Sequence, residues 1–270
     1  FRSQYDVLGG SLTSEPFGPK QPLETYFLYE HPKNDDITPQ QKEYIQNYIH
    51  GFETALLTDD FSTEERSYTD FIDLDSFLDY FILNELTGNV DAYRLSTYMH
   101  KEKSGPLKMG PVWDLNIGYN RQYRVPNIDW IANYNNHVTD DTWMVPFWWP
   151  RLMQDPGFVS EMRDAYLSER ESGGIFSDAN IKQMIDELEA ELQQPQARNF
   201  QKWQILGKYV WPQPEPIAST WKGEVDELRT WLQKRLKWLD SNMPGIYVGS
   251  EEIPEMTINA YPNPFIDAVN

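Results

Sequence analysis

The sequence predicts a mostly helical α+β domain, and three observations support this fold class. Five segments repeat apolar residues at the three- and four-residue spacing of a helix that packs against a core. One aromatic and β-branched run is followed by a glycine- and proline-containing turn and a second extended run, which is typical of a β-hairpin. The chain has 270 residues and 40% hydrophobic content, which suffices for one large domain or two small ones.

The first regular element after a turn-rich start is a helix. Residues 1–36 are irregular, with one short extended run at residues 24–30 that could form a strand. Thr38 is a suitable N-cap and Pro39 suits the first helical position. Apolar residues then recur at helical spacing, so we predict a helix over residues 39–57.

A second helix follows and should be deeply buried. It begins after Asp73 or Asp75, runs to about Leu86 and is nearly apolar on all sides. Thr87 and Gly88 end it, because a glycine at this position favours a helix stop.

The hairpin comes next, with an aspartate at each foot. Residues 93–100 are expected to pair antiparallel with residues 107–112, which places Ser96 inside the first strand. Asp91 and Asp114 then finish at the same open end. Two carboxylates delivered to one place can hold a divalent cation and orient a nucleophile.

The remainder of the chain is predicted as one long loop and three helices. Residues 115–145 look irregular, and loops of this length in compact domains are often functional. Helices are expected near residues 156–170, 178–193 and 220–240. A proline-punctuated segment, residues 195–216, separates the last two.

Composition excludes several classes of function. The net charge is −19, from 23 basic and 42 acidic residues, which disfavours nucleic acid and anionic membranes as partners. No apolar run is long enough for a transmembrane helix. The absence of cysteine rules out disulfides, a thiol nucleophile and cysteine-ligated metals. The four histidines show no pair at zinc spacing.

The order of buried helix, aspartate-bearing loop, hairpin and second aspartate matches the arrangement in protein kinases. Residues 73–118 and several downstream motifs resemble the CotH family of spore-coat and secreted kinases, in the version found in secreted Bacteroidetes proteins. The resemblance spans about residues 20–244. Its motifs include Asn84-Glu85-Leu86, Asn89-Val90-Asp91, Lys108-Met109-Gly110-Pro111-Val112-Trp113-Asp114, Trp148-Trp149-Pro150-Arg151-Leu152 and Tyr209-Val210-Trp211-Pro212.

The resemblance implies a protein-kinase-like C-lobe that uses ATP and Mg²⁺ or Mn²⁺. Asp91 takes the place of the catalytic aspartate that orients the substrate hydroxyl, and Asp114 takes the place of the metal-binding aspartate. Typical kinases carry an asparagine as second metal ligand where this chain has Ser96. Asn116, two residues beyond Asp114, could compensate as a ligand. Arg94 is expected to be solvated or charge-paired rather than bound to phosphate.

The resemblance also implies that the chain is divided into three regions. Residues 1–36 would be the remnant of an N-terminal lobe and a connector, and residues 37–244 the kinase-like C-lobe. With the N-lobe largely absent, we expect this chain to be an N-truncated fragment that is inactive by itself. Residues 245–270 would be a linker and the start of a sorting domain. Their motif Tyr261-Pro262-Asn263-Pro264-Phe265 resembles the opening of the type IX secretion sorting domain, which implies a secreted or cell-surface protein.

We therefore expect a secreted atypical protein kinase that transfers the γ-phosphoryl group of ATP to a protein hydroxyl. The alternative is a non-catalytic, surface-displayed binding module that recognises glycan or protein. The 10 Trp and 16 Tyr residues suit either core packing, which we favour, or a surface that stacks on sugars. A carbohydrate-active enzyme is a third and weaker candidate.

Overall fold

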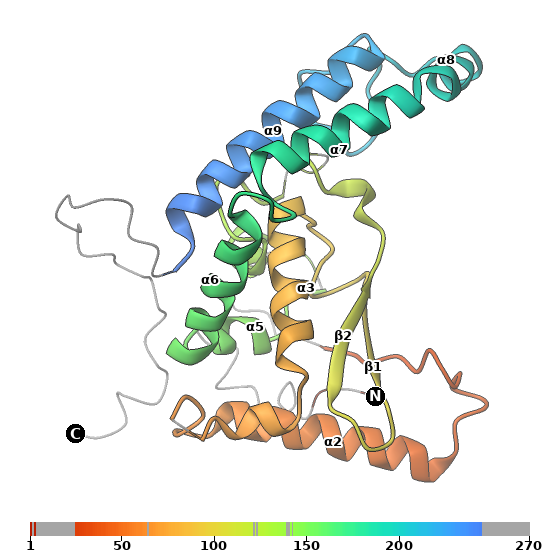
Figure 1. Cartoon of the computed structure of the whole chain (residues 1–270). Coiled ribbons are helices and arrows are strands. Elements are labelled where there is room, and N and C mark those ends of the chain that lie inside the picture. The colour runs from red at the N-terminus through yellow and green to blue at the C-terminus, as the bar shows by residue number, and fades with distance from the viewer. Residues whose placement is uncertain are drawn as a thin grey trace, which may run out of the picture.

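The computed structural model describes residues 1, 3, 25–63, 65–120, 122, 124–138, 141 and 143–244. In this part of the chain the fold is mostly helical, with one two-stranded antiparallel sheet (Figure 1). The helices and strands are α2 (Pro39–Leu57), α3 (Leu74–Thr87), β1 (Thr97–Lys101), β2 (Leu107–Val112), α4 (Tyr134–His137), α5 (Trp148–Leu152), α6 (Pro156–Arg170), α7 (Asp178–Glu191), α8 (Gln193–Lys202) and α9 (Trp221–Asn242). Short 3₁₀ turns lie at Ser67–Asp70, Leu115–Ile117 and Ile131–Asn133.

Helix α2 has the predicted bounds because its amino terminus is fully capped. The Thr38 hydroxyl accepts a hydrogen bond from Gln41 N, and the Gln41 side chain accepts one from Thr38 N, which completes a capping box. The possible strand at residues 24–30 is limited, among the described residues, to a single β-bridge position at Tyr26. On either side of it, Ser3 N donates to Thr25 O at 3.0 Å and Phe27 N donates to Phe1 O at 2.7 Å. The Phe27 ring stacks on Trp148.

Helix α3 is the central element, as its apolar sequence predicts. It contacts β2 on one side and α6 and α9 on others (Figure 1). The Asp73 side chain caps its first turn by accepting from Ser76 N at 3.0 Å. Gly88 ends it in the left-handed conformation, with φ of 63°.

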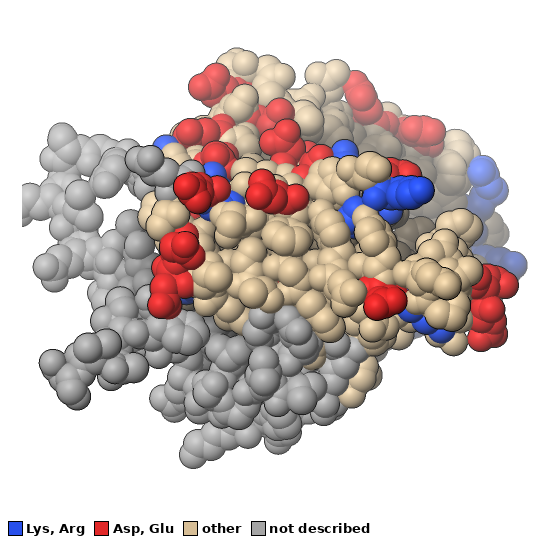
Figure 2. Space-filling model, turned by 90° about the horizontal axis from the view of Figure 1, so that it is seen from below, with Lys and Arg blue, Asp and Glu red and all other residues tan. Residues whose placement is uncertain are grey.

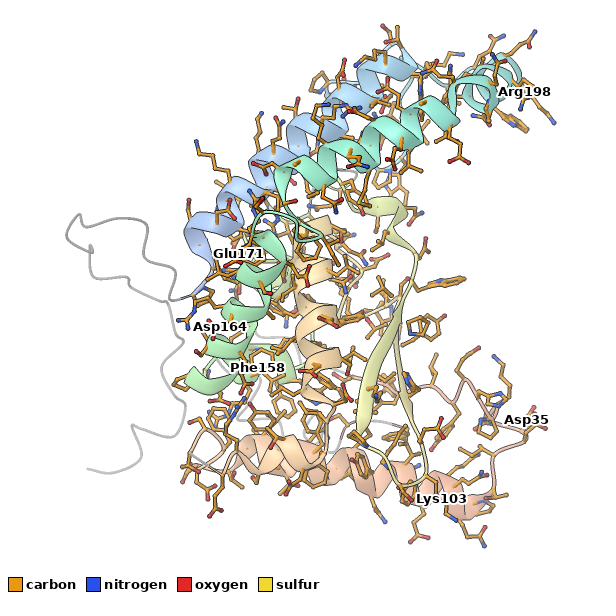
Figure 3. All side chains as sticks on the ribbon, in the orientation of Figure 1. Asp35, Lys103, Phe158, Asp164, Glu171 and Arg198 are labelled. Carbon is orange, nitrogen blue, oxygen red and sulfur yellow. The ribbon has the colours of Figure 1, made fainter. Side chains whose placement is uncertain are left out.

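The hairpin forms in antiparallel register, but its first strand is shorter than expected. β1 begins at Thr97, which pairs with Val112, so Ser96 lies before the strand and not inside it. The physical reason is Tyr93. This residue is buried with φ of 71°, and its hydroxyl reaches Glu85 on α3, which turns the chain inward before it can extend. At the other end, Lys103 lies in the turn beside α2, where Tyr44 donates to its carbonyl oxygen (Figure 3).

Aromatic side chains fill the centre of the core around Trp149. Its ring lies 4.6 Å from that of Tyr93 and 5.7 Å from that of Phe77, centroid to centroid. Trp148 and Trp149 are both buried, in agreement with the core packing that we favoured for the aromatic residues. They belong to α5, a helix that the sequence did not reveal. Pro150 fits there because the first turn of a helix needs no backbone donor.

The three carboxy-terminal helices were predicted, and the structure adds α8. Helix α8 occupies the start of the segment that we read as irregular, with Pro195 in its first turn. α7 and α9 run side by side and α8 caps their outer end, so that Arg198 lies far from the central helix (Figures 1 and 3). We call α7, α8 and residues 203–220 the arm.

The surface of the described residues reflects the acidic composition. Seen from below, acidic side chains lie along several edges and the Lys and Arg side chains form small groups (Figure 2). Among the described residues, no helix has the length and apolar character needed to cross a bilayer. Most of residues 1–36 and all of residues 245–270, including the Tyr261–Phe265 motif, lie outside the described residues.

Candidate active site at the open end of the hairpin

The loop that carries Asp91 is shaped by two buried asparagines directly after α3. Asn89 Nδ2 donates to Asn84 Oδ1 at 3.0 Å, and Asn89 Oδ1 accepts from Asp91 N at 3.3 Å. Both asparagines are buried. This pair fixes the backbone at Asp91 relative to the central helix.

The loop that carries Asp114 is tied to the same place. Thr97 pairs with Val112, two residues before Asp114. Tyr119 N then donates to Thr87 O at 2.6 Å, and a Cβ on Gly118 would lie 2.9 Å from that same oxygen. The segment after Asp114 is therefore tied to the carboxy-terminal end of α3, directly before the loop that carries Asp91.

Asp91 sits in a mixed electrostatic environment. Burial raises the pKa of its carboxyl, the charge of Arg94 lowers it, and the charges of Asp114 and Asp141 raise it again. The net pKa is above its ordinary value of 3.8. Because the charge of Asp114 acts on Asp91, the two carboxylates belong to one electrostatic site.

Asp114 differs from Asp91 because it is exposed and has left-handed backbone angles, φ 60° and ψ 64°. Such a conformation is costly for most residues and recurs at functional sites, where the surroundings impose it. Among the described residues, its carboxylate makes no hydrogen bond or ion pair. A free carboxylate on a fixed turn is well suited to bind a cation.

The other two predicted ligands are less clearly placed. Asn116 is exposed, two residues beyond Asp114, and lines a hollow of about 320 Å³ between the Leu115–Ile117 turn and the start of α9. Ser96 is half-buried and makes no hydrogen bond to either aspartate among the described residues. Within the described ranges, no three acidic or histidine side chains are grouped to hold a metal by themselves.

These donors still fit Mg²⁺ or Mn²⁺ that arrives with a nucleotide. Mg²⁺ prefers oxygen ligands and is usually held by one or two carboxylates together with waters and substrate phosphates. Asp114 supplies a carboxylate that has no cationic partner in the part of the chain that the structure describes, and Asn116 supplies an amide oxygen on the same turn. We therefore regard Asp114 and Asn116 as the residues able to hold such an ion.

Arg94, just before β1, and Lys108, on β2, are both charge-paired, as expected. Arg94 Nη2 binds Asp91 Oδ1 at 2.9 Å, and Arg94 Nη1 lies 3.2 Å from Asp141 Oδ2. Lys108 pairs with Asp73 at 3.0 Å. Neither side chain is free for a phosphate.

A buried pair beneath the site was missed at the sequence level. Glu85 on α3 and Arg235 on α9 are each about 1% exposed and form an ion pair at 3.2 Å. Glu85 also accepts from the Tyr93 hydroxyl and from the backbone N–H groups of Ile131 and Ala132. Burial raises the pKa of Glu85, and these contacts oppose that rise.

Glu85 therefore connects the central helix, the Asp91 loop and the long segment after Asp114. The one available signal was a glutamate within a nearly apolar helix, in the motif Asn84-Glu85-Leu86. Arg235 gave no signal, because charged residues are ordinary on the solvent side of an amphipathic helix.

The long segment at residues 115–145 is more ordered than expected. It contains two 3₁₀ turns and helix α4, which is anchored by Tyr134 in the core. Its backbone donates to Glu85 from Ile131 and Ala132, as described above, and its carbonyl oxygens at Asn127 and Asp129 accept from Arg235.

Comparison with known proteins identifies one match. The family model described as CotH kinase protein matches residues 14–239, far more than half of the chain. Neither the curated proteins nor the solved structures contain a match. The extent of the family match and the placement of its aspartate motifs on one hairpin lead to one conclusion: this chain belongs to the CotH kinase protein family.

Proposed function

We propose that this chain carries the catalytic and metal-binding end of a CotH-like protein kinase that transfers the γ-phosphoryl group of ATP to a protein hydroxyl. One observation carries the proposal. Two carboxylates whose charges act on each other lie at one end of the hairpin. One of them is fixed by an arginine, and the other has no ion-pair partner within the described ranges.

The two carboxylates have different roles in this proposal. Asp91 is half-buried and held by Arg94, so it can accept a hydrogen bond from the acceptor hydroxyl and orient it. Asp114 and Asn116 would hold Mg²⁺ or Mn²⁺. The ion would supply neutralisation of the nucleotide phosphates, which a chain of net charge −19 otherwise repels.

The experiment is nucleotide binding by the full-length gene product, measured by calorimetry with ATP in Mg²⁺ or Mn²⁺ and then in chelator. We expect metal-dependent binding that Asp114→Ala abolishes. Asp79→Ala, which removes an exposed acid from α3, is the matched control and should bind as the wild type does. Equal binding by Asp114→Ala and wild type would refute the metal assignment.

Phosphate transfer is the second measurement. Incorporation of labelled phosphate into protein should depend on ATP and metal and should fall by at least 10²-fold in Asp91→Asn. Transfer that persists in Asp91→Asn would remove the catalytic role of this residue.

A second candidate, a binding module without catalysis, is favoured by the arm. Trp203, Tyr209 and Trp211 expose 58%, 60% and 66% of their surface, which is unusual for large aromatic side chains. Exposed aromatic rings suit stacking on sugars or contact with proteins. Absence of nucleotide binding, together with glycan binding that Trp211→Ala abolishes, would support this candidate.

We also propose export to the cell exterior, which rests on the resemblance of residues 261–265 to a type IX sorting signal. Localisation of the full-length protein with and without residues 245–270 tests it. Loss of surface or secreted protein on deletion is the expected result, and unchanged localisation would contradict it.

A further inference from the structure

We propose that Arg94 is a positioning residue for Asp91, held in place by Asp141 and Tyr134. The inference rests on the proposed phosphotransfer function, because it assigns Asp91 the catalytic role. It adds residues that the family resemblance did not assign.

The Arg94 guanidinium is fixed on every edge. Nη2 donates to Asp91 Oδ1 at 2.9 Å, and Nη1 contacts Asp141 Oδ2 and Trp143 O, each at 3.2 Å. Nε donates to Val90 O at 3.0 Å. The side chain is 4% exposed, and its bonds to Asp91, Asp141 and Val90 are partly buried, so together they hold one rotamer.

Asp141 is equally constrained on the far side of Arg94. Its Oδ2 accepts from the Tyr134 hydroxyl at 2.6 Å and from Arg124 Nη1 at 3.2 Å, and its Oδ1 accepts from Trp143 N at 3.0 Å. The Tyr134 ring also lies beneath Arg94, 4.1 Å from the guanidinium carbon to the ring centroid. A chain of contacts thus runs from Tyr134 in the core through Asp141 and Arg94 to Asp91.

These contacts leave one carboxylate oxygen of Asp91 available to the substrate hydroxyl that would accept the phosphoryl group. Its Oδ1 is engaged by Arg94, whereas its Oδ2 accepts no hydrogen bond among the described residues. The side chain is 23% exposed, so the free oxygen can be reached from outside. Arg94 therefore selects the direction in which Asp91 presents its second oxygen.

A lysine could not replace Arg94 in this role. The two carboxylates and two carbonyl oxygens lie around different edges of one planar group, and an ammonium on a flexible stem is a single point charge. We expect Arg94→Lys to retain the charge but lose the simultaneous contacts to Asp91 and Asp141.

The test compares kcat and KM for ATP in the full-length gene product. Arg94→Met should lower kcat about 100-fold, because small misplacements of a reacting group have effects of this size. KM for ATP should change less than about twofold, since Asp114 and not Arg94 holds the metal–nucleotide complex. Arg94→Lys and Asp141→Asn should each lower kcat about tenfold. Guanidinium added to Arg94→Ala should restore part of the lost kcat.

Arg66→Met is the matched control. Arg66 is also mostly buried and ion-paired, with Asp155 at 2.7 Å, but it precedes the 3₁₀ turn at Ser67–Asp70 and contacts the capping residue of α6. The Arg66→Met variant should have a lower midpoint temperature of thermal unfolding than the wild type and an unchanged kcat. If Arg94→Met does not fold, Tyr134→Phe provides a second test, because it removes one hydroxyl and keeps the ring. This variant should lower kcat severalfold and leave KM for ATP unchanged.

Two different results would overturn two different statements. If Asp91→Asn abolishes transfer while Arg94→Met or Tyr134→Phe keeps the wild-type kcat, the positioning role is wrong and the phosphotransfer function stands. If Asp91→Asn transfers phosphate as the wild type does, the proposed function itself is wrong.

Discussion

At the scale of single residues, Gly88 shows how closely the site is packed. Its φ of 63° favours glycine, and a Cβ there would lie 3.1 Å from Cζ2 of the buried Trp231. We expect Gly88→Ala to lower the free energy of unfolding by about 2–4 kcal/mol, from backbone strain and overpacking together. Urea denaturation measures this loss.

Gly207 provides the control for that prediction. Its φ of 72° is similar, but a Cβ there would meet Ser219 at an ordinary 3.5 Å. Gly207→Ala should therefore show the backbone cost alone, about 1–2 kcal/mol. Equal losses in the two variants would show that contact with Trp231 has no energetic effect.

The ionisation of Asp141 is expected to make the free energy of unfolding depend on pH. Burial raises the pKa of Asp141, but bonds from Tyr134 and Trp143 N–H and the charges of Arg94 and Arg124 bring it below 3.8. A lowered native pKa stabilises the fold above the unfolded pKa, and this stabilisation is lost as pH falls through the native pKa. The stability difference between wild type and Asp141→Asn should be constant at pH 5–7 and shrink below about pH 4.

Denaturation in urea at a series of pH values checks this expectation. Asp164→Asn, at an exposed acid on α6, reports the effect of removing an unburied carboxyl. A difference between wild type and Asp141→Asn that persists unchanged to pH 2 would contradict the assignment.

Residues of the candidate site could be predicted where the signal was local. Asp91 and Asp114 could be proposed from the sequence because each stands at a fixed place beside a recognisable hairpin. Ser96 was placed wrongly, because the inward turn at Tyr93 depends on Glu85 across the core. Arg235 was missed because its partner is 150 residues away, and no periodicity reports such a contact.

At the scale of elements, the cap of α3 connects helix and hairpin. Asp73 caps the helix through Ser76 N and pairs with Lys108 on β2. Asp73→Ala should lower the free energy of unfolding by about 1 kcal/mol, mostly from the lost cap. Thermal or urea unfolding gives the value.

Asp79→Ala is the comparison on the same helix. Burial raises the pKa of Asp79, and neighbouring Asp75, Glu169 and Asp73 raise it further. Removing this repelled carboxylate should leave stability unchanged or slightly higher. A loss equal to that of Asp73→Ala would mean that the cap contributes nothing specific.

Elements with strong end signals were predicted well. α2 and α6 each have a capping residue followed by proline, and α3 ends at a glycine. α5 and α8 were missed because each contains a proline near its start, which reads as a loop signal in sequence. Proline is compatible with the first turn of a helix, and the prolines of α5 and α8 both lie in that turn, so they do not interrupt these helices.

At the scale of the whole molecule, Glu85 and Arg235 hold three regions together. Arg235 binds Glu85 and also donates to the carbonyl oxygens of Asn127 and Asp129. Arg235→Met should lower the free energy of unfolding by about 3–5 kcal/mol, because it leaves a buried carboxylate without its partner. Equilibrium unfolding in urea measures the loss.

The double variant separates charge from packing. Glu85→Gln combined with Arg235→Met should be more stable than Arg235→Met alone, since no uncompensated charge stays in the core. If the double variant is no more stable than Arg235→Met alone, the loss in Arg235→Met comes from the contacts of Arg235 itself and not from an uncompensated charge on Glu85.

The position of Arg235 so late in the chain has a consequence for biosynthesis. A nascent polypeptide that has emerged only through α6 already contains both aspartates, yet Glu85 still lacks its counter-charge. The ion pair beneath the two aspartates can thus form only once translation has passed Arg235 in α9, 150 residues after Glu85.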